Sequence, residues 1–90
     1  MTTHEVVTKF VWGAESGKAS GGRLRIEGDK VVNYGTTLAQ RVEGKVIVNM
    51  TKYSRTTTVH QNRLLREVGQ HAIVVTDVPM GAWDLQQYVS

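Results

Sequence analysis

The stretch "NMTKYSRTTTVHQNRLLREVG", residues 49–69, decides the fold because it carries the chain from a strand into its one long helix. At about 100° per residue, three apolar side chains fall within one arc of that helix: Leu64, Leu65 and Val68. Polar side chains fall on the opposite side: Asn62, Arg63 and Arg66. This periodicity predicts a helix that packs on a sheet and presents arginines to solvent.

Local signals set the ends of the predicted helix. Thr58 followed by Gln61 has the spacing of a capping box, in which two side chains satisfy backbone N–H groups that the helix leaves free. Gly69 is well placed to end the helix, because glycine readily adopts the conformation found just past helix C-termini. We therefore expect the helix over about residues 58–68.

Around this helix, five segments have the alternation or the β-branched content of strands: residues 5–12, 23–27, 30–42, 45–51 and 71–76. Tight turns at Gly28-Asp29 and Glu43-Gly44 predict antiparallel neighbours. Gly35, inside the third segment, predicts a bulge. The order of strands, helix, strand and tail predicts an α+β fold: a small antiparallel sheet of about five strands, covered on one face by a single main helix.

The length of 90 residues predicts one domain, residues 1–90, with a flexible loop at 13–22 and a C-terminal tail at 78–90. Cysteine is absent, so neither disulfides nor thiolate metal sites can support the core. No stretch approaches the roughly 20 apolar residues that span a bilayer, and the N-terminus lacks a secretory pattern. We therefore expect no membrane association and a cytoplasmic location.

The formal net charge of +3 is unevenly distributed. Between residues 41 and 66 the chain carries six cations and one anion, and from Glu67 to the end it carries three anions and no cation. This asymmetry is typical of a basic face that meets phosphate or an acidic protein, and equally of a solvated face.

Several familiar chemistries lack their motifs. The loop at 13–20, "GAESGKAS", has three residues where a Walker loop has four, and Ala19 stands where that motif needs Ser or Thr. The three histidines have no i, i+4 pair for zinc. Ser54 and His60 lie close in sequence but have no visible acid or oxyanion hole. We expect no metal and no cofactor, and a small hydrolase or nuclease using His60 remains only an alternative.

The start of the helix is the strongest candidate site. Its free N–H groups and dipole favour anions, and four hydroxyls gather there: Ser54, Thr56, Thr57 and Thr58. Lys52 and Arg55 add charge, and Tyr53 offers a ring on which a base could stack. The alternative is structural, with the hydroxyls capping the helix and satisfying the turn.

Strand pairing predicts a second wall for this site. If residues 30–42 pair with residues 45–51 about the Glu43-Gly44 turn, Thr36 falls near the end of the strand that leads into the helix. We expect one polar cluster, which a structural network would also form: Tyr34, Thr36, Tyr53, Ser54, Thr57 and His60.

Two motifs resemble those of small domains of unassigned function encoded by bacteriophages and mobile elements. One is a Tyr-x-Thr-x-aliphatic-Ala strand, here Tyr34, Thr36, Leu38 and Ala39. The other is a Tyr-Ser-x-Thr-Thr-x-x-His stretch that enters a helix, here Tyr53, Ser54, Thr56, Thr57 and His60. The resemblance covers residues 30–65 and implies a phage-type accessory protein in a bacterial host cytoplasm.

We therefore expect a non-catalytic binding protein whose ligand is a nucleotide or nucleic-acid phosphate at residues 52–61. The expected ligand-binding residues share that junction and its second wall: Tyr34, Thr36, Lys52, Tyr53, Ser54, Arg55, Thr56, Thr57 and His60. The alternative is an inhibitor of a host or defence enzyme that docks through the basic helix face or the tail, with Arg63, Arg66 and Trp83 as contact residues. A homodimer is possible in either case.

Overall fold

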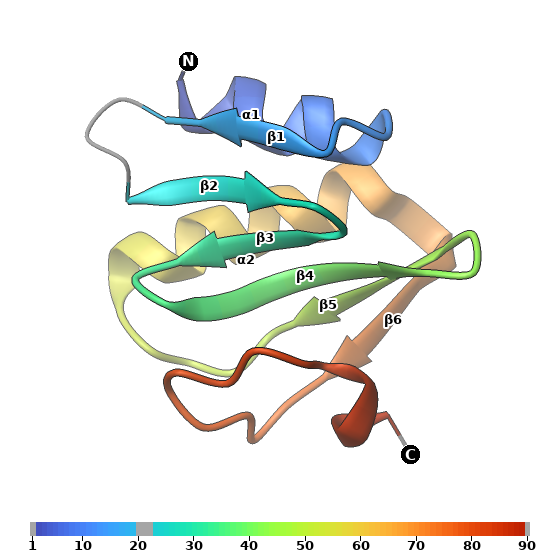
Figure 1. The fold of residues 1–90 in the computed structure, drawn as a ribbon. Coiled ribbons are helices and arrows are strands. Elements are labelled where there is room, and N and C mark those ends of the chain that lie inside the picture. The colour runs from blue at the N-terminus through green and yellow to red at the C-terminus, as the bar shows by residue number, and fades with distance from the viewer. Residues whose placement is uncertain (1, 20–22, 90) are drawn as a thin grey trace.

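The computed structural model describes residues 2–19 and 23–89 (Figure 1). Two α-helices, two short 3-10 helices and six strands follow one another along the chain: α1 (Thr3–Val11), β1 (Ser16–Lys18), β2 (Leu24–Glu27), β3 (Lys30–Asn33), β4 (Thr36–Val42), β5 (Lys45–Asn49), α2 (Arg55–Val68), η1 (Gly69–His71), β6 (Ala72–Val75) and η2 (Gln86–Tyr88). The predicted α+β class is confirmed, with α2 as the main helix.

The strands form one sheet in the order β1-β2-β3-β4-β5-β6, the order in which they occur along the chain. All neighbours pair antiparallel except β5 and β6, which are parallel. The parallel pair follows from α2, because a crossover helix carries the chain back to the end of the sheet at which β5 began. The sheet expected to be wholly antiparallel is therefore mixed at one edge.

Residues 5–12 were expected to form a strand, and that expectation is wrong because they belong largely to α1. Thr2 and Glu5 form a capping box that starts the helix. Val6, Val7 and Phe10 are fully buried, which is the spacing of one helical face rather than strand alternation. The expected loop at 13–22 contains the three-residue strand β1, and its residues 20–22 lie outside the described part of the chain.

The expected single strand over 30–42 is two strands, β3 and β4, joined by a turn at Tyr34 and Gly35. Both turn residues have positive φ, 51° and 80°, as in the two-residue turns that close hairpins. Gly35 thus supplies a turn rather than a bulge. The register shift lies instead between Val31 and Val32, opposite β4.

The main helix begins three residues earlier than expected. Ser54 is its N-cap, and its Oγ accepts a hydrogen bond from the Thr57 N–H at 3.2 Å. Thr58, expected as the cap, instead lies within the first turn and donates its hydroxyl to the Ser54 carbonyl at 2.8 Å. Gly69 ends α2 with a φ of 75°, as expected.

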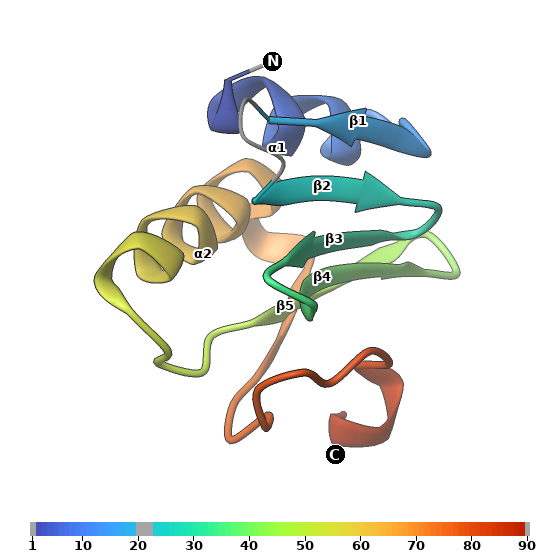
Figure 2. The ribbon, with the colours of Figure 1, turned by 60° about the vertical axis from the view of Figure 1, so that its left-hand side comes forward.

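The two faces of the sheet are covered differently (Figure 2). The helix face, covered by α1 and α2, holds an apolar cluster that includes Val6, Val7, Phe10, Leu24, Ile26, Leu38, Val48 and Leu64. The tail face is covered by the C-terminal tail, residues 78–89, over a smaller cluster of Ile47, Val75, Val78 and Leu85. The tail is thus one layer of the fold.

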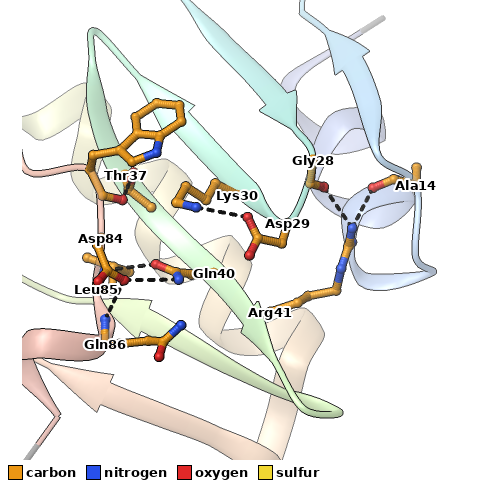
Figure 3. Close-up of polar contacts among 11 residues, drawn as sticks. Ala14, Gly28, Asp29, Lys30, Thr37, Gln40, Arg41, Asp84, Leu85 and Gln86 are labelled. Atoms are coloured by element: carbon orange, nitrogen blue, oxygen red, sulfur yellow. Dashed lines mark hydrogen bonds and ion pairs between the residues drawn. The ribbon is translucent and has the colours of Figure 1, made fainter.

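Thr37 and Gln40 of β4 hold the tail, mostly through its backbone (Figure 3). The Thr37 N–H donates to the Ala82 carbonyl at 2.9 Å, and the Thr37 hydroxyl donates to the Trp83 carbonyl at 2.6 Å. Gln40 donates to the Asp84 carboxylate at 3.1 Å and accepts from the Leu85 N–H at 2.8 Å. These bonds fix the path of the tail across the sheet.

Arg41 connects the helix layer to the sheet on the opposite side of the view in Figure 3. Its guanidinium donates to three carbonyls: Phe10 at 2.5 Å, Ala14 at 3.0 Å and Gly28 at 2.9 Å. The same group lies 4.4 Å from the centre of the Phe10 ring. Arg41, one of the six cations of the basic segment, is therefore committed to structure.

Among the helices of the described residues, none has the length and apolar content that crossing a membrane requires.

Candidate functional site

A pocket of about 240 Å³ opens where β3, β4, α2 and the C-terminal tail meet. Its lining combines two tyrosines, two apolar side chains and four small polar ones: Asn33, Tyr34, Thr36, Leu38, Tyr53, Ser54, Thr57 and Met80. No charged residue lines it. The sheet end and the helix start therefore enclose a neutral pocket bordered by aromatic rings.

The polar groups at the helix side of the pocket are bonded to one another. The Ser54 hydroxyl donates to Thr57 Oγ1 at 3.0 Å, and the Thr57 hydroxyl donates to Asn33 Oδ1 at 3.0 Å. Asn33 Nδ2 in turn donates to the Arg23 carbonyl at 2.9 Å. This series of hydrogen bonds connects α2 to β3 and makes the pocket wall rigid. The same bonds would form if these hydroxyls served only to cap the helix and satisfy the turn.

Tyr53 is held in place through its hydroxyl. Asn49 Nδ2 donates to the Tyr53 oxygen at 2.9 Å, and the Tyr53 hydroxyl donates to the Val78 carbonyl at 2.6 Å. Gln61, fully enclosed on α2, donates to the carbonyls of Asn49 and Thr51 at 2.8 and 2.7 Å. The turn between β5 and α2 is thereby fixed, and the Tyr53 side chain is held in the pocket lining.

Tyr34 forms the outer rim of the pocket from an unfavourable backbone position. A positive φ is uncommon for any residue with a side chain and is an outlier for a bulky one, and this first turn position favours Asn, Asp or Gly. The side chain is 64% exposed, so burial does not offset that strain. The neighbouring Thr36 hydroxyl accepts from the Gly81 N–H at 2.8 Å, which holds the tail against the pocket.

A second, more open hollow of about 380 Å³ adjoins the pocket across Tyr53 and Ser54, which line both. Its other lining residues are Lys52, Arg55 and Thr58. Two cations and no acidic side chain line this hollow, so it is suited to an anion. The neutral pocket and the cationic hollow form one continuous surface around the Tyr53 ring.

Most of the predicted ligand-binding residues lie on this surface. Five of the six residues of the expected cluster line the pocket: Tyr34, Thr36, Tyr53, Ser54 and Thr57. Lys52 and Arg55 line the adjoining hollow, whereas Thr56 is exposed on α2 and lines neither. Sequence reasoning missed Asn33, Leu38 and Met80. Leu38 stood within the motif already noted, but no sequence signal places Met80 at the pocket.

His60, like Thr56, is a predicted site residue that lies outside the pocket and the hollow. Its side chain is buried and lines neither the pocket nor the hollow. Burial lowers the pKa of its imidazole, and the positive charge of Arg63 lowers it further. The hydroxyl of Ser54 donates to Thr57 rather than to His60, so the two do not form a nucleophile and base pair.

The residues expected to contact a protein partner lie on two parts of the fold, α2 and the C-terminal tail. Arg63 is half-buried and contacts the His4 ring, so α1 and α2 share it. Arg66 is exposed on α2. Trp83, on the tail, is 48% exposed, and the Lys30 ammonium lies 5.2 Å from its ring centre. Arg63 and Arg66 therefore share α2, whereas Trp83 lies on the C-terminal tail.

Within residues 2–19 and 23–89, no group of three or more His, Cys, Asp or Glu side chains could hold a metal ion. Comparisons with protein-family models, with curated proteins and with solved structures gave no match for this chain.

Proposed function

We propose that this protein binds a nucleotide unit without catalysis, with the base in the neutral pocket and the phosphate in the adjoining hollow. The unit is either free or part of a single-stranded nucleic acid. The resemblance to phage-encoded domains supports an accessory role of this kind in a bacterial cytoplasm.

The observation that carries the proposal is the position of Tyr34. The turn geometry favours asparagine or glycine there, and the exposed ring contributes little packing. A strained backbone that packing does not offset is expected where a side chain serves a ligand. Tyr34 and Tyr53 border the same pocket, so a flat ring entering it would contact aromatic side chains.

The lining chemistry supports a base more than a charged group inside the pocket itself. The hydroxyls and amide of Ser54, Thr57 and Asn33 already bond to one another, so they offer few free donors to an anion. Aromatic rings and the Met80 thioether instead favour stacking and dispersion, which tolerate any base. The sequence predicts that these hydroxyls bind the phosphate. We propose instead that they form the wall against which the base lies.

The phosphate is assigned to the adjoining hollow. Lys52 and Arg55 are both exposed there, and neither forms an ion pair with another described residue. They lie next to Tyr53 in the chain or in space, so a ligand stacked on Tyr53 would carry its phosphate toward them. Electrostatic contacts of this kind give binding that weakens as salt rises.

The decisive experiment replaces Tyr34 by the residue that the turn favours. Fluorescence anisotropy of a labelled single-stranded DNA of mixed sequence should show Tyr34→Asn weakening binding by about 1–3 kcal/mol, the usual loss for one base–aromatic stack. The melting temperature should stay the same or rise, because Asn suits the turn. Undiminished binding by Tyr34→Asn, or no binding of DNA, RNA or mononucleotides by the wild type, would overturn the proposal.

Glu43→Asn is the matched control. Glu43 and Gly44 form a second hairpin turn with φ of 50° and 80°, nearly those of Tyr34 and Gly35. Glu43 does not line the pocket or the cationic hollow. The control should therefore show the same change in melting temperature and leave nucleic-acid binding intact.

The phosphate assignment has its own test. Replacing Lys52 and Arg55 by alanine should weaken binding and reduce the slope of log affinity against log salt by roughly one per lost contact. Lys45→Ala, an exposed cation at the opposite end of β5, serves as the control. Competition by mononucleotides then distinguishes the two kinds of ligand. If the ligand is a free nucleotide, a mononucleotide should displace the labelled DNA at equal molar amounts. If the ligand is a single strand, it should not.

A further inference from the structure

The sheet ends in β6, whose outer edge carries unpaired backbone groups. β6 pairs with β5 in parallel, with Val74 beside Val48. The Met50 N–H donates to the Val75 carbonyl at 2.9 Å, so Ile73 and Val75 direct their backbone groups toward β5. Because direction alternates along a strand, Val74 and Thr76 direct theirs outward. On that outer side the described residues form one bond, from the Ala72 N–H to the Gly69 carbonyl.

The two edges of the sheet differ in protection. β1, at the other edge, has only three residues, one of them Lys18, and short charged edge strands resist pairing with other chains. From Ala72 to Thr76 the β6 edge has no charge, no proline and no bulge. Val74 is 50% exposed there, a β-branched side chain that favours a strand neighbour. Among the usual devices against strand addition, the β6 edge therefore lacks charge, proline and a bulge, although β6 has only four residues.

We infer that β6 pairs antiparallel with β6 of a second copy of this chain, about a twofold axis at Val74. Each Val74 N–H then donates to the Val74 carbonyl of the other copy, and each Thr76 N–H donates to the other Ala72 carbonyl. Ile73 faces Val75 across the axis. Every side-chain pair in this register is uncharged, and the two exposed valines cover each other.

The ends of the pair also suit a second copy as the occupant, because no like charges meet there. His71 of one copy and Asp77 of the other flank the paired segment at both of its ends, outside the strand itself, because His71 belongs to η1 and Asp77 has a φ of 58°. An imidazole N–H can donate to a carboxylate, whereas like charges opposite one another would destabilise the pair. The contact is isologous and closes on itself, so it forms a dimer rather than a fibre. The joined sheet would carry two pockets, although the inference does not depend on what they bind.

The mass of the protein in solution tests the inference. Light scattering coupled to size exclusion, over a range of protein concentrations, should show a dimer for the wild type and a monomer for Val74→Lys, which places charge on the edge. Val59→Lys is the matched control, because Val59 is 56% exposed on α2, away from the edge. It should remain dimeric. A wild type that stays monomeric at all concentrations, or a Val74→Lys dimer, would overturn the inference.

Amide hydrogen exchange tests the same pairing without a substitution. In the dimer the N–H groups of Val74 and Thr76 should be protected, and their protection should increase with protein concentration. The N–H of Val75 points toward β5 and should be protected at every concentration, which makes it an internal control. Rapid exchange at Val74 in a sample that is dimeric by mass would place the dimer contact elsewhere.

Discussion

The two faces of the sheet are held by different forces. The helix face is covered by α1 and α2 over a cluster of fully buried apolar side chains such as Phe10 and Leu64. The tail face has a smaller apolar cluster, and β4 binds the backbone of the tail with Thr36, Thr37 and Gln40. Hydrophobic burial contributes more than such hydrogen bonds, so the helix layer should govern global stability while the tail opens locally.

The largest expected effect comes from the helix face. Phe10→Ala should lower the free energy of unfolding by about 3–5 kcal/mol, because it removes a fully buried ring and also the surface on which the Arg41 guanidinium stacks. Denaturant unfolding followed by circular dichroism measures this loss. If Phe10→Ala lost less unfolding free energy than Gln40→Leu on the tail face, the helix face would not be the main source of stability.

A smaller effect is expected from Gln40→Leu on the tail face. The side chain is almost fully buried, and its loss leaves the Leu85 N–H without its acceptor, at a cost of about 1–3 kcal/mol. Hydrogen exchange should show faster opening of residues 81–86 while α2 remains protected. Equal acceleration in both regions would mean that the two faces unfold as one unit.

Mild acid should act first through the helix layer. The pKa of His60 is lowered in the folded protein by burial and by Arg63, so the unfolded chain takes up a proton at higher pH than the folded one does. The contribution of neutral His60 to the free energy of unfolding is therefore fully present above about pH 6.5, and it decreases as the pH falls below that value. Melting temperatures between pH 8 and pH 5 measure the decrease. His60→Gln should remove it, and His71→Gln, at an exposed position, should not.

Stronger acid should act on the tail face. The backbone N–H of Gln86 lowers the pKa of Asp84, and the Gln40 side chain and the Lys30 charge lower it further. The contribution of this carboxylate is present above its ordinary pKa of about 3.9 and is lost as the pH falls through the lower folded value. Trp83 fluorescence should report the change, and Asp84→Asn should remove its pH dependence. If the pH dependence of Trp83 fluorescence persists in Asp84→Asn, it arises from a group other than Asp84.

The sequence predicts the strands around the hairpins and the main helix because local signals dominate there. It fails at residues 5–12, where β-branched and aromatic residues favour a strand, although the Thr2 and Glu5 capping box predicts the helix that forms. Here the packing of Val6, Val7 and Phe10 against the sheet overrides β propensity, as tertiary contacts often do.

The candidate site shows the same division between local and distant information. Tyr34 and Tyr53 are expected to approach each other from strand pairing alone, and both line the pocket, even though Tyr34 lies in a turn rather than a strand. Met80 could not be placed, because the tail follows a path fixed by side chains about 45 positions earlier in the sequence. Local patterns do not encode contacts of that range.

Arg41 has a consequence for the order in which the protein becomes structured during synthesis. The first helix leaves the ribosome early, but the guanidinium that binds its Phe10 carbonyl is 31 residues further along the chain. Helix formation in so short a peptide is marginal without a partner. The N-terminal segment should therefore remain unanchored in nascent chains until β4 has emerged. Proteases should cut this segment in ribosome-bound fragments that end before β4.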